Sequence, residues 1–275
     1  MAWSWRVLRS GGMRLDGGSM FGVVPRALWA RMTPPDDANR IALAANCLLL
    51  ERGGTRVLVE AGFGDKWSDK ERDLYALERR TIVTALAEVG VAPADIDLVV
   101  VTHLHFDHAG GLTHLDAAGH AVPTFSRARV AVQRLEWEDA LANKSTMSRT
   151  YLRDHLDPIA DRVTLHDGEV QVLPGLWAWP TPGHTWGHQS IRFEAEGGVV
   201  CYSGDVVPTV NHVAPAFSMG YDMLPYDNSR TKAALLDRAR AESWRLALDH
   251  EPGPCVVTVE ADGDRKGRYR LVPVA

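Results

Sequence analysis

Hydrophobic residues along the chain fall into short strand-like runs separated by turns and by a few helical stretches. Mostly apolar runs lie at 46–51 and 56–62, and the turn-forming residues 52–55 lie between these two runs. Short apolar runs bounded by Gly and charged residues are typical of strands. Further strands are predicted at 5–10, 96–103, 162–166, 169–175, 177–181, 190–195, 198–205, 254–261 and 269–275.

Helical spacing of apolar residues appears in both halves of the chain. It predicts helices over 77–90, 132–143, 148–156 and 228–250. The first of these helices ends at Gly90, and the last is the longest. Because strands dominate both halves and each half also carries helices, the pattern favours an α+β fold in which helices cover two packed sheets. No linker interrupts it, so we expect a single domain over 1–275, with 1–40 contributing a strand and a loop that lines a pocket.

Composition narrows the classes of partner. The formal net charge of −5 argues against nucleic acid, because phosphate binding requires a basic face. Three well-separated cysteines argue against a disulfide framework or a cysteine-based zinc site. The N-terminus lacks the apolar core of a signal peptide, and no apolar run reaches membrane-spanning length, so we expect a cytoplasmic protein without a membrane partner.

One short segment concentrates the candidate chemistry. The stretch THLHFDHAGG places His103, His105, Asp107 and His108 directly after a predicted buried strand. Alternate side chains of an extended segment face the same side, so His103 and His105 can bind one metal ion. Asp107 and His108 lie on the following turn and diverge from that pair. They are available for a second ion.

Four ligands do not complete two metal sites, so further ligands are expected elsewhere. The segment TPGHTWGH offers His184 and His188, YSGD offers Asp205, and LALDH offers His250 at the end of the predicted long helix. These polar residues follow regular elements, where functional sites are commonly built.

Taken in order, these motifs resemble those of the metallo-β-lactamase-fold hydrolase superfamily. The resemblance spans roughly residues 40 to 255. Residues 16–30 further resemble the opening of a branch that includes quorum-quenching lactonases and methyl parathion hydrolase. The resemblance implies a four-layer αββα sandwich of two mixed β-sheets flanked by helices.

The resemblance also implies a role for each candidate. His103, His105 and His184 match ligands of a first metal ion, and Asp107, His108 and His250 match ligands of a second. Asp205 matches a carboxylate that bridges both ions. Asp107 and Asp205 are the candidates for proton transfer, whereas His188 is expected behind the ligands. Nitrogen and oxygen donors without thiolates favour two zinc ions, with manganese, iron or cobalt left open.

Two residues depart from the family pattern. Glu60 stands where the family often has Asp, and we expect its longer carboxylate to alter the contacts that orient the metal-binding histidines. Pro208 occupies the position of a tyrosine that many acyl-homoserine lactonases carry three residues after the bridging aspartate. The function of that tyrosine must then be absent or supplied from elsewhere.

Two apolar segments, 19–29 and 211–226, are candidates for the walls of a substrate pocket. An alternative interpretation is that they pack in the core, because apolar stripes usually do so. The pocket candidates are Met20, Phe21, Trp29, His212, Met219, Tyr221 and Met223.

These observations predict a dinuclear metal-dependent hydrolase that opens a small ester or lactone of the N-acyl homoserine lactone type by means of a hydroxide between the ions. An organophosphate or aryl-ester hydrolase with the same ions is the first alternative. A mononuclear iron dioxygenase and a metal-stabilised binding module are less favoured. The expected partner is a small molecule, and the sequence leaves a homodimer open.

Overall fold

A six-stranded mixed sheet is built mainly from the first half of the chain in a computed structural model, which describes residues 2–263 and 267–274. Its long first two strands pair antiparallel, and β3, β4, β7 and β8 run parallel to one another. In spatial order the strands are β1 (Ser4–Asp16), β2 (Arg40–Arg52), β3 (Thr55–Val59), β4 (Leu98–Val100), β7 (Arg129–Gln133) and β8 (Val163–His166).

A seven-stranded sheet is built from strands in the second half of the described chain. The pair β12–β13 is parallel, and the neighbouring pairs are antiparallel. In spatial order the strands are β15 (Tyr269–Pro273), β14 (Val256–Ala261), β13 (Arg245–Ala247), β12 (Gly198–Tyr202), β11 (Gln189–Ala195), β10 (Leu176–Pro180) and β9 (Val170–Leu173). A small hairpin, β5 (Thr113–Leu115) and β6 (Ala121–Pro123), lies apart from both sheets.

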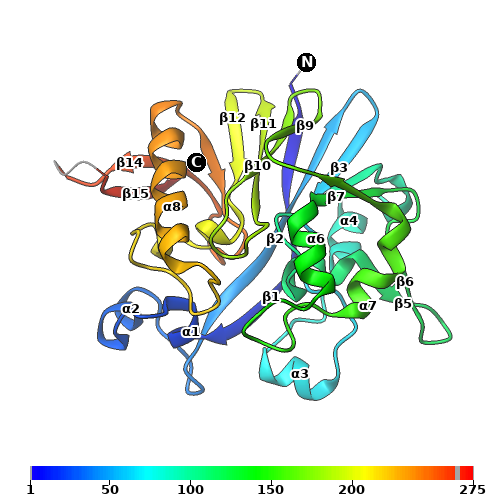
Figure 1. Ribbon diagram of the computed structural model, residues 1–275, viewed down its shortest axis with the longest axis horizontal. Helices are drawn as coiled ribbons and strands as arrows, with labels where there is room; N and C mark the ends of the chain where they lie inside the picture. Colours follow the sequence, from blue (N-terminus) through cyan, green and yellow to red (C-terminus); the bar gives the residue numbers. More distant parts are fainter. Residues whose placement is uncertain (1, 264–266, 275) are drawn as a thin grey trace.

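Helices cover the outer faces of the two sheets. In Figure 1, α8 covers the second sheet on one side of the molecule, and α4, α6 and α7 cover the first sheet on the other. The α-helices are α1 (Gly17–Phe21), α2 (Arg26–Met32), α3 (Asp69–Leu74), α4 (Ile82–Glu88), α5 (Phe106–Ala109), α6 (Arg134–Leu141), α7 (Arg153–Leu156) and α8 (Pro225–Ala241). The 3₁₀ turns are η1 (Pro93–Asp95), η2 (Gly110–Leu112), η3 (Asp157–Arg162), η4 (Gly204–Val206) and η5 (Val210–His212).

Alternating side chains show that both faces of the sheets are buried. On β2, Leu48 and Leu50 belong to the core between the sheets, whereas Leu49 packs toward α4. On β12, Val200 faces the core between the sheets and Cys201 faces α8. Side chains of a strand point alternately to opposite faces. The three cores therefore separate four layers, which confirms the predicted αββα sandwich.

The longest predicted helix, 228–250, is wrong at its C-terminal end. Helix α8 ends at Ala241, and Ser243 adopts a left-handed backbone conformation with φ 55°. Beyond it Trp244, Leu246 and Leu248 are buried in the core beneath α8. This spacing of two is the strand period, and strand β13 pairs with β12. His250 consequently follows a strand rather than ending a helix.

The other predicted elements differ from the structure mainly in length. The helix expected over 148–156 is limited to Arg153–Leu156, followed by the 3₁₀ turn η3. The first strand extends well beyond 5–10, and two short helices, α1 and α2, follow it. Of the last predicted strand, Ala275 lies outside the described residues, as do residues 1 and 264–266 of the predicted single domain. The single-domain organisation itself stays a prediction.

Candidate metal centre

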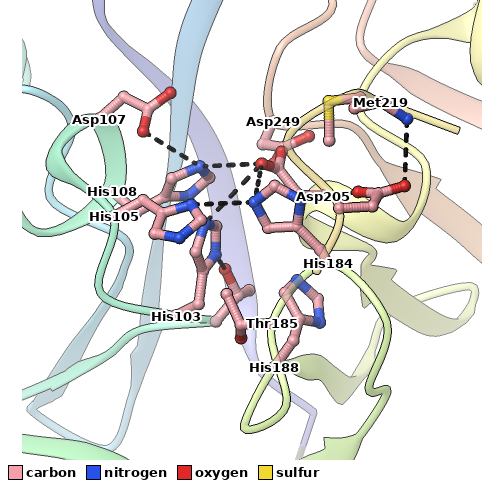
Figure 2. A network of polar contacts seen from close by, with 12 residues as sticks. His103, His105, Asp107, His108, His184, Thr185, His188, Asp205, Met219 and Asp249 are labelled. Atoms are coloured by element: carbon pink, nitrogen blue, oxygen red, sulfur yellow. Dashed lines mark hydrogen bonds and ion pairs between the residues drawn. The ribbon is translucent and has the colours of Figure 1, made fainter. Parts of the chain in front are cut away.

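Segments from four distant parts of the chain bring the predicted ligands to one edge of the sandwich. His103 and His105 follow β4, while Asp107 and His108 lie on the short helix α5. His184 lies in the β10–β11 loop, Asp205 in η4 after β12, and His250 after β13. Figure 2 shows the rings of His103, His105, His108 and His184 gathered around the carboxylate of Asp205.

The backbone after β4 explains why neighbouring residues face two different sites. His105 has extended angles, φ −62° and ψ 157°, and α5 begins at the next residue. Asp107 and His108 therefore leave on a helical turn, away from the direction of His103 and His105. Glycine is required at Gly110 and Gly111 because a Cβ there would lie 2.2 Å from the Phe63 carbonyl oxygen and 2.1 Å from that of Ala61. Close backbone approach, rather than a left-handed bend, thus explains both glycines.

A first donor group consists of one atom each from His103, His105, His184 and Asp205, all within 4.8 Å of one another. His184 Nε2 lies 2.9 Å from His105 Nδ1 and 2.9 Å from Asp205 Oδ2. His103 Nε2 lies 3.8 Å from the same carboxylate oxygen. These are the residues that the sequence predicts as ligands of a first ion, together with the predicted bridge.

A second donor group consists of His108, Asp205, Asp249 and His250, whose donor atoms also lie within 4.8 Å of one another. Asp107 stands beside this group, with Oδ2 3.6 Å from His250 Nε2 and Oδ1 3.9 Å from His108 Nε2. Asp249 was not among the ligands predicted from the sequence. Its signal was its position directly before His250 in a segment of alternating apolar residues, LALDH.

Asp205 belongs to both donor groups, and its two oxygens face different histidines. Oδ1 lies 3.1 Å from His250 Nε2, and Oδ2 lies 2.9 Å from His184 Nε2. Although burial opposes its ionisation, His184 and His250 hold the pKa of Asp205 well below its usual value. A carboxylate in this position is able to bridge two cations.

Several buried polar atoms point into the space between these residues without a hydrogen-bond partner among the described residues. They include His103 Nε2, His108 Nε2 and Asp205 Oδ1. An unpaired buried polar atom costs about 1–3 kcal/mol, so such a cluster requires a further group. Imidazole nitrogens and carboxylate oxygens are the donors that divalent zinc accepts. The donor set therefore fits two divalent cations.

Electrostatics in the free protein support the same conclusion. Burial, followed by repulsion from His108 and His105, holds the pKa of His103 well below its usual value. Burial also opposes a charge on His108, but Asp107, Glu60 and Asp205 outweigh it and raise the pKa of His108 to about 9. Protons on such histidines compete with metal ions for the same nitrogens, so metal binding releases protons.

The ring nitrogens that face away from the donor groups have partners that orient the histidines. His250 Nδ1 donates to the carbonyl oxygen of Ala44 at 2.8 Å, and His184 Nδ1 lies 2.8 Å from Asp222 Oδ1. Such partners fix ring orientation and strengthen a histidine as a metal ligand. Asp222 was not among the residues predicted from the sequence, where its signal is a lone carboxylate within an apolar segment.

Glu60 lies behind His108. Its Oε1 accepts from the backbone nitrogen of Thr102 at 2.7 Å, and its Oε2 lies 3.5 Å from His108 Nδ1. Glu60 has φ 67°, a left-handed conformation that is uncommon for residues other than glycine. The longer side chain therefore reaches both the histidine segment and one of its rings from the end of β3.

His188 lies beside the donor groups but belongs to neither. Its Nδ1 is 2.9 Å from Thr181 Oγ1, and its ring centroid is 5.3 Å from that of His103. Figure 2 shows His188 apart from Asp205, with no dashed line to it. The supporting role assigned to His188 stays a prediction.

Glu136 on α6 is a further residue that the sequence analysis missed. Its Oε1 accepts from the backbone nitrogen of Leu104 at 2.9 Å and from the Tyr151 hydroxyl at 3.1 Å. Its Oε2 accepts from the Thr185 hydroxyl at 2.6 Å. Burial raises the pKa of this carboxyl, opposed by these hydrogen bonds. One buried side chain thus connects both histidine-bearing loops, and only the tertiary contact distinguishes it from other helical glutamates.

A cavity of about 450 Å³ opens over the donor groups. Five of the predicted ligands border it directly, and Arg149 is the one lysine or arginine among the described lining residues. Tyr75 and Phe106 stack on one wall with ring centroids 5.6 Å apart. The lining residues are Leu15, Met20, Tyr75, His105, Phe106, Asp107, 146–150, His184, Asp205, Met219, Tyr221 and His250.

The predicted pocket residues are only partly found on this cavity. Met20, Met219 and Tyr221 line it, whereas Met223 does not. The prediction that Phe21, Trp29 and His212 line the cavity is wrong, because these rings pack against one another. Phe21 stacks on Trp29 at 5.5 Å and on His212 at 4.6 Å between centroids. The cavity wall at 146–150 was not predicted, and its last three residues were assigned to the helix expected over 148–156.

The departure at Pro208 also has a structural consequence. Its carbonyl oxygen accepts from the backbone nitrogen of His250 at 3.0 Å, so this residue supports a predicted ligand through the main chain. A tyrosine does reach the cavity from another segment, since Tyr221 lines it. Burial raises the pKa of Tyr221 to about 12, so its hydroxyl stays protonated.

Comparison with known proteins places these features in a family. A model described as the metallo-beta-lactamase superfamily matches residues 40–250. N-acyl homoserine lactonase AiiA of Bacillus thuringiensis subsp. kurstaki is 31% identical over 176 residues, which cover 60% of this chain and 62% of that protein. The chain thus matches less than two thirds of the length of this curated relative.

Solved structures share the whole fold. A structure described as a probable metal-dependent hydrolase from Staphylococcus aureus has a TM-score of 0.88 and 31% identity, covering 100% of this chain and 98% of that one. AidC, described as a dizinc quorum-quenching lactonase in complex with a product, has a TM-score of 0.80 at 17% identity, covering 99% and 95%. At that identity the second likeness concerns the fold alone.

Proposed function

The chain belongs to the metallo-β-lactamase superfamily, and from this premise we propose that it is a dinuclear metal-dependent hydrolase that opens a small lactone of the N-acyl homoserine lactone type. The observation that carries the proposal is the position of Asp205 between two donor groups, with Oδ2 2.9 Å from His184 Nε2 and Oδ1 3.1 Å from His250 Nε2. A single-ion centre would not need a carboxylate shared in this way.

The proposed ligands form two sets. His103, His105 and His184 would hold one ion, and His108 and His250 would hold the other with Asp107 or Asp249, while Asp205 is shared. Donors of nitrogen and oxygen without sulfur favour zinc over softer metals. When bound, two such ions supply Lewis acidity and lower the pKa of water toward 7.

The protein's own groups would then direct the reaction. A lactone carbonyl at the cavity floor gains a bond from the water oxygen, the ring C–O bond breaks, and the leaving oxygen receives a proton to give a hydroxy acid. Asp107 borders the cavity and has no hydrogen bond to a neighbouring side chain among the described contacts. We therefore assign to its carboxylate the transfer of the proton from the attacking water to the leaving oxygen.

The cavity supports a substrate with an apolar body. Leu15, Met20, Phe106 and Met219 contribute apolar surface on its walls. A volume of about 450 Å³ is in the range of small-molecule sites. The AiiA relative carries the name N-acyl homoserine lactonase, which is consistent with this substrate class.

An aryl ester or organophosphate is the second candidate substrate. The specific observation in its favour is the aromatic wall made by Tyr75, Phe106 and Tyr221. Aromatic rings pack well against an aryl leaving group. The same donor groups would serve either reaction, so substrate assays must separate the two candidates.

The test begins with the metal content of the purified protein and continues with assays on acyl-homoserine lactones, aryl esters and phosphotriesters, with and without a chelator. His105→Ala removes a donor of the first group, and we expect about 10³-fold loss of kcat/KM together with loss of one bound ion. His120→Ala is the matched control, because His120 has a side chain that is 78% exposed.

Two results would change the conclusion. Hydrolysis that survives both metal removal and His105→Ala would reject the metal-dependent mechanism. Turnover of phosphotriesters with no turnover of lactones would favour the second candidate. A single tightly bound iron ion per chain would point instead to the mononuclear dioxygenase chemistry that the sequence left open.

A further inference from the structure

Asp222 lies between a proposed metal ligand and the wall of the substrate cavity. Its side chain is 0% exposed, and Oδ1 lies 2.8 Å from His184 Nδ1. Oδ2 accepts from the backbone nitrogen of Met219 at 3.0 Å and from Asn228 Nδ2 at 2.6 Å. Figure 2 shows the Met219 nitrogen making its contact next to the histidine cluster.

This arrangement requires a carboxylate. Two of the three partners of Asp222 are fixed donors, the Met219 N–H and the Asn228 amide NH₂, and both are directed at Oδ2. A carboxylate offers acceptors on both oxygens, whereas an amide offers one acceptor and one donor. With both oxygens accepting, His184 carries its proton on Nδ1. Nε2, which faces His105, Asp205 and the proposed first metal position, is then the ring nitrogen left to bind an ion.

The same segment also forms part of the cavity. Met219 and Tyr221, on either side of Gly220, line it. The backbone nitrogen of Met223 donates to the carbonyl oxygen of His184 at 2.9 Å, and that of Leu224 donates to Gly183 at 2.9 Å. Segment 219–224 is therefore joined to the His184 loop by the Asp222 side chain and by two main-chain hydrogen bonds.

From these contacts we infer that Asp222 is a positioning residue that couples metal binding at His184 to the shape of the substrate wall. The inference rests on the proposed metal centre and deepens it. Metal binding fixes the orientation of the His184 ring, which hydrogen-bonds Asp222. Asp222 in turn accepts from the backbone nitrogen of Met219, which lines one wall of the cavity. Partners of this kind typically contribute 10–100-fold to metal affinity.

The decisive comparison pairs Asp222→Asn with Asn228→Ala. Asp222→Asn keeps the size of the side chain but turns one acceptor into a donor. The new NH₂ group would then face another donor, either the His184 Nδ1–H or the two N–H groups that now donate to Oδ2. Asn228→Ala removes one hydrogen bond to Asp222 and leaves the His184 contact in place. Zinc affinity and stoichiometry are measured by competition with a chromophoric chelator, and the stability of the metal-free proteins by urea unfolding.

We expect the first zinc equivalent to bind about 10–100-fold more weakly in Asp222→Asn, and the affinity of Asn228→Ala to stay within about threefold of wild type. We also expect KM for the best substrate to rise in Asp222→Asn, because Met219 and Tyr221 lose their support. Equal loss of metal-free stability in the two variants with unchanged zinc affinity would show a purely structural role and overturn the inference.

A measurement on the unaltered protein covers the case in which Asp222→Asn does not fold. Hydrogen exchange at the Met219 amide should slow when the protein is loaded with zinc, because the amide donates to Asp222. Unchanged exchange upon zinc binding would overturn the coupling. These readouts do not depend on the substrate: wild-type protein that binds two ions but hydrolyses no lactone would reject the proposed substrate alone.

Discussion

The hydroxyl of Thr185 donates to Glu136 Oε2 at 2.6 Å, which joins the loop of His184 to helix α6. Glu136 Oε1 meanwhile accepts from the backbone nitrogen of Leu104, between His103 and His105. Three proposed ligands of one metal ion thus depend on a single buried carboxylate that touches none of them. Preorganisation of this kind explains how segments 80 residues apart can present their nitrogens together.

Replacement of Glu136 is expected to destabilise both the fold and the metal centre. Glu136→Ala leaves the Leu104 N–H and the Tyr151 and Thr185 hydroxyls without their acceptor. Each unsatisfied buried donor costs about 1–3 kcal/mol, so we expect a loss of about 3 kcal/mol or more in the free energy of unfolding. Urea unfolding measures this loss, and zinc titration should show weaker binding.

The control for this variant is Glu138→Ala, which removes an exposed carboxylate from the same helix. We expect a change within about 0.5 kcal/mol there, as is usual for surface positions. A similar loss in both variants would show that α6 itself, rather than the buried carboxylate, is sensitive to substitution.

The pH dependence of stability should reveal His155, which is buried beside Trp67. Burial, assisted by nearby Lys66, lowers the pKa of His155 to about 3. The unfolded chain binds a proton at this residue below about pH 6.5, whereas the folded chain stays neutral until about pH 3. Protonation of His155 in the unfolded chain therefore leaves the free energy of unfolding unchanged above pH 6.5. Below pH 6.5 it lowers that free energy by about 1.4 kcal/mol per pH unit as the pH falls.

His155→Phe keeps an aromatic ring and removes this titration. The difference in unfolding free energy between the variant and the wild type should shift in favour of the variant by about 3 kcal/mol from pH 6.5 to pH 4. Both proteins are measured by urea unfolding with excess chelator, and His120→Phe at an exposed position serves as control. A pH-independent difference would contradict the assignment.

Close packing of Gly187 against α6 gives a third prediction. A Cβ at Gly187 would lie 2.3 Å from the backbone nitrogen of Glu136, a distance that side chains do not adopt. Gly187→Ala must displace either α6 or the loop between His184 and His188. Overpacking of this kind typically costs about 1–3 kcal/mol, and weaker zinc binding should accompany it.

Gly253→Ala provides the comparison for this substitution. A Cβ at Gly253 would meet only the flexible end of Glu251 within 4 Å, at 3.0 Å from its Oε1. We expect thermal unfolding of this variant to follow the wild type closely. If Gly187→Ala had the stability and zinc affinity of the wild type, the loop could move away from α6 without cost. That result would contradict the close packing described above.

Local sequence determined the elements that depend on neighbouring residues. The continuous apolar runs of β2 and β12 reflect burial of both sheet faces, so the strands and the layered α+β architecture were predictable. The HLHFDH run likewise encodes its own geometry, because an extended segment followed by a helical turn directs His105 and His108 to different donor groups. Part of the chemistry was therefore readable from one segment.

Tertiary structure alone decided the contacts between distant segments. Asp222, Asp249 and Glu136 are ordinary acidic residues in the sequence, and they gain their places only when β13, α6 and the 219–224 segment pack beside the histidines. The same packing placed Phe21 in the core and Met20 on the cavity, although the two are neighbours. Sequence periodicity indicates which face of a helix or strand is apolar. Which other element packs against that face depends on how all the layers are arranged.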